Sequence, residues 1–202
     1  GNDSFLLESL YKKRGQNFVN DYVAYTLEST KCIGLKVINA GGSEFFKNGG
    51  EVFNLDDVVP SYGVSSREIL KTLNIANEEL KIKHPLHVHC NNLGVPGNID
   101  TIIETIKSAE GRRMHLAHVQ FYAYDKRGKK GFSSGSLDLA EAVNSNKNIT
   151  VDVGQVMFNP TVTISSDIMR QFSARKNANP KKWVMSEVED GGGGIVPYHY
   201  RE

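Results

Sequence analysis

The stretch that decides the fold is Leu86-His87-Val88-His89-Cys90, which directly follows Pro85. Its apolar character and its length predict a short strand. Successive side chains of a strand point to opposite faces, so His87 and His89 face the same side. Polar groups near the carboxyl ends of parallel strands line the crevice where ligands bind. This one stretch therefore predicts a strand and a candidate site together.

Similar apolar runs lie on either side of this stretch and alternate with helical patterns. The runs cover 33–38, 114–121 and 149–153, and residues with 3.6-residue spacing predict helices over 3–13, 18–30, 66–82, 99–109, 136–145 and 165–175. Ser65-Ser66 and Asn98 are candidate caps for two of these helices. The alternation predicts βαβ units with a parallel sheet. Four strands make about half of a closed (β/α)8 barrel, which typically needs ~250 residues, so we expect either an open sheet or part of a longer protein.

Length and composition restrict the class of protein. The chain has 202 residues, and no linker or repeat divides it, so residues 1–202 are expected to form a single segment. A formal net charge of +1 argues against a nucleic-acid binder. No apolar run is long enough to cross a membrane. Cys32 and Cys90 lie far apart, which is typical of a reduced, cytoplasmic protein.

Each predicted strand carries a residue that could bind a metal or titrate. These residues are Lys36, the pair His87 and His89, the pair His115 and His118, and Asp152. His115 and His118 are three apart, so they are expected to face opposite sides of their strand. Alone, each has an ordinary alternative: a strand histidine is often a hydrogen-bonded core residue, and Asp152 can accept main-chain hydrogen bonds. Together they favour a site for zinc or a similar divalent ion.

The lysine adds a specific chemical possibility. A neutral lysine becomes an oxygen ligand when carbon dioxide converts its amine to a carbamate. Two metal ions bridged by such a group would lower the pKa of bound water and polarise a carbonyl oxygen, which predicts hydrolysis of an amide or formamide. No GxSxG, Walker A or GxGxxG motif follows a strand, which argues against a serine hydrolase or nucleotide enzyme. The glycine run Gly191–Gly194 predicts a flexible loop.

The order of lysine, histidine and histidine on successive strands resembles the fourth to sixth barrel strands of the amidohydrolase superfamily. More narrowly, the chain resembles the A subunit of formylmethanofuran dehydrogenase through the runs 34–42, 87–94, 118–121 and 151–156. Further stretches look closest to the bacterial branch, where this protein belongs to a formyltransferase/hydrolase complex. Those stretches are 131–134, 163–167, 171–172 and 194–198.

The resemblance implies roles for particular residues. Lys36 would be the carbamylated ligand that bridges two zinc or other divalent ions, and His89 and His118 would be further ligands. His87 would contact substrate or orient a ligand, although an exchange of roles between His87 and His89 stays open. Contacts to substrate or to the ligands are also implied for Asn91, Asn92, Gln120 and Asp152, with packing or turn roles equally open for the three amides.

The resemblance also implies a fold, an activity and partners. The fold is a partial (β/α)8 barrel, about strands four to seven, without the first-strand His-x-His pair and the eighth-strand catalytic aspartate of the superfamily. The activity is hydrolysis of N-formylmethanofuran, or of a methanofuran analogue, to formate and the free amine. The partners are the other subunits of the complex and a methanofuran-type carrier. Two alternatives remain: the archaeal type, which interconverts formate and formylmethanofuran, and a non-catalytic scaffold.

Overall fold

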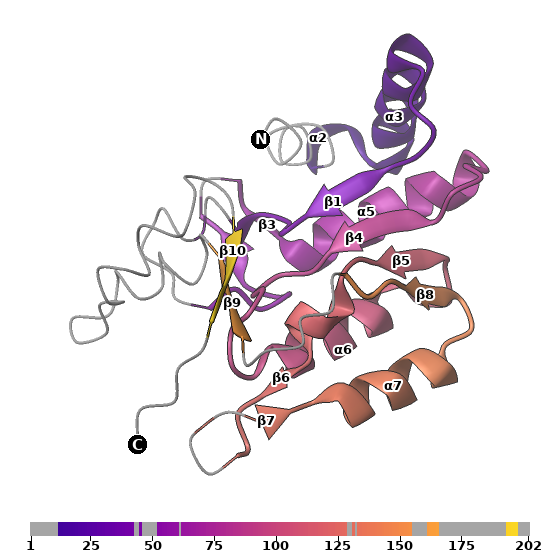
Figure 1. The fold of residues 1–202 in the computed structure, drawn as a ribbon. Helices are drawn as coiled ribbons and strands as arrows, with labels where there is room; N and C mark the ends of the chain where they lie inside the picture. Colours follow the sequence, from indigo (N-terminus) through magenta and orange to yellow (C-terminus); the bar gives the residue numbers. More distant parts are fainter. Residues whose placement is uncertain are drawn as a thin grey trace.

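The computed structural model describes residues 12–42, 45, 52–60, 62–128, 131, 133–154, 161–165 and 193–197. Its centre is a four-stranded sheet with the strand order β1-β4-β5-β8, in which all neighbours run parallel (Figure 1). The strands are β1 (Lys36–Ile38), β4 (Leu86–His89), β5 (Met114–Leu116) and β8 (Ile149–Val151). The four predicted strands and the α/β class are confirmed.

Helices follow the strands in the predicted order. The helices are α2 (Lys12–Arg14), α3 (Gln16–Thr30), α5 (Ser66–Glu79), α6 (Asn98–Ser108) and α7 (Ser136–Ser145), with a 3-10 helix η2 (Val119–Tyr122). The helices predicted over 18–30, 66–82, 99–109 and 136–145 are therefore confirmed. Most of the helix predicted over 3–13 and nearly all of the one over 165–175 lie outside the described residues.

Three small antiparallel pairs complete the described structure. They are β2 (Val58–Val59) with β3 (Val64–Ser65), β6 (Tyr124–Asp125) with β7 (Ser133–Ser134), and β9 (Thr161–Ser165) with β10 (Gly193–Pro197). The loop predicted for Gly191–Gly194 is wrong for its second half, because Gly193 and Gly194 pair with β9. Strand pairing uses main-chain hydrogen bonds, so residues without side chains can take part in it.

Of the two predicted helix caps, one is observed and the other is not. Ser65 caps α5 as predicted: its hydroxyl accepts a hydrogen bond from the Glu68 main-chain N–H, and the Glu68 carboxylate accepts one from the Ser65 N–H. The cap predicted at Asn98 is wrong. The capping position of α6 is Gly97, with φ 89°, and no side chain caps this helix. Asn98 is the first helical residue, and its side chain bonds to neighbouring loops instead.

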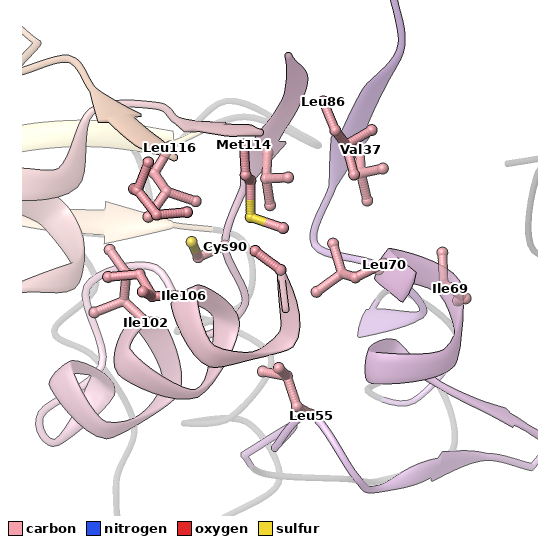
Figure 2. Packing of buried hydrophobic residues seen from close by; sticks show 14 of the residues in the cluster. Val37, Leu55, Ile69, Leu70, Leu86, Cys90, Ile102, Ile106, Met114 and Leu116 are labelled. Carbon is pink, nitrogen blue, oxygen red and sulfur yellow. The ribbon is translucent and has the colours of Figure 1, made fainter. Parts of the chain in front are cut away.

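The central sheet has one apolar face and one polar face. Figure 2 shows Leu86, Met114 and Leu116 packed among side chains of α5 and α6. The buried face contributes Val37, Leu86, Val88, Met114, Leu116 and Ile149, which meet Ile69, Leu70, Ala76, Ile102 and Ile106 of the helices. The opposite face carries Lys36 and the strand histidines and is more accessible in the described part of the chain. Burial of the apolar face therefore determines which side chains remain available for chemistry.

The helices in the described part of the chain are all too short or too polar to cross a membrane.

Leucines with opposite exposure test this packing. In the full-length protein, Leu116→Ala removes a fully buried side chain, so we expect it to lower the free energy of unfolding by about 2–5 kcal/mol. The matched control is Leu137→Ala on α7, where the side chain is 78% exposed and the expected change is within about 0.5 kcal/mol. Denaturant titrations measure both values. Equal losses in the two variants would contradict the assigned core.

The two cysteines should differ in reactivity. Cys90 is buried, and loss of hydration raises its pKa to about 12, whereas Cys32 is exposed. We expect a thiol reagent to modify Cys32 rapidly in the native protein and Cys90 only after denaturation. Peptide mapping by mass spectrometry identifies each labelled site, and Cys32→Ser should abolish the rapid labelling of its peptide without exposing Cys90. Rapid native labelling of Cys90 would show that β4 is not packed as described.

Candidate metal centre

The strand register places four polar residues in one row across the sheet. Lys36 pairs with His87, His87 with His115, and His115 with Thr150. Because the strands are parallel and in register, these side chains share the polar face. His89 lies on the same face, two residues further along β4 at its carboxyl end. The sheet thus gathers the predicted lysine and histidines on one surface.

Three imidazole rings form a continuous chain on this surface. The Nε2 atom of His89 lies 3.1 Å from Nε2 of His87, and its Nδ1 atom lies 2.7 Å from Nε2 of His118. The ring centroids are 5.1 Å and 4.5 Å apart, respectively. His89 therefore contacts both of the other histidines that the sequence placed in the site.

His118 reaches this chain through an unusual main-chain conformation. Strand β5 ends at Leu116, and His118 has φ 36° and ψ 55°, in the left-handed region. The expectation that His115 and His118 face opposite sides is wrong. It assumed a continuous strand, whereas the turn at His118 directs its ring back toward His89. His115 stays on the strand, with its ring centroid 5.1 Å from that of His87.

Asp152 holds this turn in place. One carboxylate oxygen accepts a hydrogen bond of 2.6 Å from the main-chain N–H of His118, and the other lies 3.0 Å from Nε2 of His115. The main-chain oxygen of Asp152 also accepts a hydrogen bond from the N–H of Val119. The His118 N–H above all, with His115, lowers the pKa of Asp152. An ionised aspartate thus fixes a main-chain conformation that only a few per cent of residues other than glycine adopt.

Partial burial favours the neutral form of these three imidazoles. Loss of hydration is the main cause that lowers the pKa values of His87, His89 and His118, and the pKa of His89 falls to about 4. A neutral imidazole has one nitrogen lone pair available to a metal ion. The Nδ1 atom of His118 is buried and has no hydrogen-bond partner among the described residues. The donor chemistry therefore fits a metal ion that prefers nitrogen ligands.

The described residues alone do not form a complete metal cage. Among them, no group of three or more His, Cys, Asp or Glu side chains is arranged to hold an ion. His89 and His118 are hydrogen-bonded to each other. Lys36 is exposed and lies opposite His87 rather than His89. A common ion held by Lys36, His89 and His118 stays a prediction.

The amides predicted near the site have distinct surroundings. Asn91 donates to the Ser66 hydroxyl at 3.0 Å, and Asn92 exchanges two hydrogen bonds with the main chain of Phe53. Both amides are buried away from the polar face. Gln120 accepts a hydrogen bond from the Gly154 N–H through Oε1, while its Nε2 atom is buried and lacks a hydrogen-bond partner in the described part. The Nε2 atom of Gln120 is therefore available to hydrogen-bond a further group.

The sequence analysis named His115 beside His118 as a candidate but gave it no role, and it did not include Thr150. The Nδ1 atom of His115 lies 2.9 Å from the Thr150 hydroxyl. Lys36, His84, His87 and His115 also line a depression of about 380 Å³ near the amino ends of β1 and β4. The even spacing that linked His87 to His89 offered no such signal for His115, because only strand pairing shows that it lies beside His87.

The chain is similar in sequence to two known proteins. No family model matches the chain. It is 49% identical over 206 aligned residues to the A subunit of the formyltransferase/hydrolase complex Fhc of Methylorubrum extorquens, covering 100% of this chain and 38% of that protein. It is 36% identical over 213 aligned residues to protein FwdA of Methanocaldococcus jannaschii, covering 99% and 37%, respectively. The chain thus spans less than two fifths of the length of these relatives.

The chain is also similar to a solved structure of the Fhc complex. The crystal structure of the formyltransferase/hydrolase complex FhcABCD from Methylorubrum extorquens, in complex with methylofuran, matches with a TM-score of 0.74 and 46% sequence identity. The match covers 98% of this chain and 36% of that chain. The chain is therefore homologous, along its whole length, to a segment of the A subunit of the formyltransferase/hydrolase complex.

Proposed function

We propose that the chain is part of a metal-dependent amidohydrolase subunit. It would hydrolyse N-formylmethanofuran, or a methanofuran analogue, to formate and the free amine. The observation that carries this proposal is the chain of half-buried, neutral imidazoles of His87, His89 and His118, in which His89 and His118 lie at the carboxyl ends of parallel strands. The relationship to a component of a complex solved with methylofuran supports the choice of carrier.

The architecture supports a segment of a (β/α)8 barrel. Four parallel strands have helices on one face, and the face that bears Lys36, His87 and His115 is more accessible. In a closed barrel the helices form the outer ring, so this polar face would line the interior. The described strands would then correspond to about strands four to seven. His89 and His118 would lie at the carboxyl end, where barrel enzymes have their active sites.

The residues of the chain have definable roles in this proposal. Carbamylated Lys36, His89 and His118 would hold zinc or another divalent ion. A bound ion would lower the pKa of a water molecule and polarise the formyl oxygen. Asp152 keeps the His118 loop in its left-handed turn, as its hydrogen bond to the His118 N–H indicates. His87, which contacts His89, would orient that ligand or bind substrate.

The partners would be the other subunits of a formyltransferase/hydrolase complex. The similarity to FwdA supports a second candidate, an archaeal-type subunit that interconverts formate and formylmethanofuran. Identity of 49% with the Fhc protein, compared with 36% for FwdA, favours the first candidate. Purification of the natural assembly distinguishes them: a formyltransferase beside this protein supports the hydrolase complex, and a molybdenum or tungsten subunit supports the dehydrogenase.

Histidine substitutions test the ligand assignment. In the full-length complex, we expect His89→Ala and His118→Ala each to weaken metal binding by more than about tenfold, because removal of a ligand exceeds the loss seen for outer contacts. The control is His84→Ala, which removes an exposed imidazole before β4. Metal analysis of the purified variants measures the effect. Unchanged metal content in both ligand variants would reject the assignment.

Lysine carbamylation predicts a dependence on carbon dioxide. After removal of metal and bicarbonate, zinc alone should restore little formate release from N-formylmethanofuran, whereas zinc with bicarbonate should restore it. Lys36→Ala should remain inactive with both, while Lys31→Ala, which removes an exposed ammonium at the end of α3, should recover like the unmodified protein. Equal recovery with and without bicarbonate would exclude the carbamate.

A further inference from the structure

The buried amide side chain of Asn98 makes three hydrogen bonds, all to main-chain groups outside its own helix. It is 1% exposed. Its Nδ2 atom donates to the main-chain oxygens of Asn92 at 2.9 Å and Phe121 at 2.8 Å, and its Oδ1 atom accepts from the Tyr124 N–H at 2.9 Å. Gly97 already occupies the capping position of α6. The side chain of Asn98 therefore joins segments outside its own helix rather than capping that helix.

The two carbonyl groups that Asn98 joins belong to the segments that directly follow His89 and His118, and Phe121 lies in η2. Asn92 lies three residues after His89, and Phe121 lies three residues after His118. The Gly94 N–H also donates to the Phe121 oxygen at 2.9 Å, so the two loops meet directly at this point. Where the same two segments begin, Nδ1 of His89 and Nε2 of His118 are 2.7 Å apart.

We propose that Asn98 is a positioning residue that sets the placement of His89 relative to His118. Its planar amide holds two carbonyl oxygens at one nitrogen and an N–H at the oxygen, all within one rigid group. Aspartate would present no N–H donor to the carbonyls, and leucine would present neither donor nor acceptor. The consequence for metal binding rests on the proposed function, whereas the consequence for loop geometry does not.

Asn77 provides a matched control for a purely structural role. It is a buried asparagine on α5, 2% exposed, and its Nδ2 atom donates to the main-chain oxygen of His84 at 3.1 Å. His84 precedes β4, at the opposite end of the strand from His89. A substitution at Asn77 thus removes a comparable buried contact to a loop that does not carry His89 or His118.

The experiment compares Asn98→Asp with Asn77→Asp in the full-length complex. Zinc affinity is measured by competition with a chelator, and the structures of the metal-free variants are determined. We expect Asn98→Asp to weaken zinc binding by about 10–100-fold and to change the separation of the His89 and His118 rings by more than about 0.5 Å. Asn77→Asp should keep the zinc affinity and the ring separation of the unmodified complex. Asn98→Ala and Asn77→Ala repeat the comparison without a buried charge.

The outcomes separate this inference from the proposed function. An unchanged ring separation in a folded Asn98 variant would overturn the positioning role, as would the same loss of zinc affinity at Asn77. A complex that binds neither zinc nor another divalent ion before substitution would reject the metal-dependent function. In that case the ring separation alone would still decide whether Asn98 positions the two histidines.

Discussion

The structure depends on the alternation of side chains along one short strand. In β4, Leu86 and Val88 point into the helical layer, which leaves His87 and His89 on the other face. If the pairing of β4 with its neighbours shifted by one residue, both imidazoles would be buried among apolar side chains and both apolar residues would be exposed. The pairing register of β4 is therefore strongly determined. The neighbouring strands follow the same rule, and their polar residues are aligned with the histidines by parallel pairing.

Buried amide side chains hold the segments that follow β4 and β5. The loops beyond β4 and β5 enter the protein interior, where main-chain groups without partners would be costly. Asn92 exchanges hydrogen bonds with the main chain of Phe53, and Asn98 bonds to three main-chain groups in the segments after β4 and β5. These contacts convert irregular segments into defined supports for His89 and His118. The candidate site thus rests on polar contacts that are protected from competition with water.

The electrostatics of the site follow from the same burial. Loss of hydration keeps the imidazoles neutral, while direct hydrogen bonds keep Asp152 ionised. Neutral nitrogen donors beside a fixed carboxylate suit the proposed binding of a divalent ion. Lys36 is more accessible than the imidazoles, and the homologous proteins are more than twice as long as this chain. The proposed barrel would place the remaining ligands opposite the described face.

The sequence by itself determined the four strands, the order of the helices between them and the shared face of His87 and His89. These features are local, because periodicity and turn residues act over a few positions. Tertiary structure decided the position of His118, the alignment of His115 with His87, and the contacts of Asn98. Each of these depends on contacts between segments distant in sequence: Asp152 holds the turn at His118, strand pairing places His115, and two loops meet at Asn98. Local patterns carry no information on such contacts, since the partner residues become neighbours only when the sheet assembles.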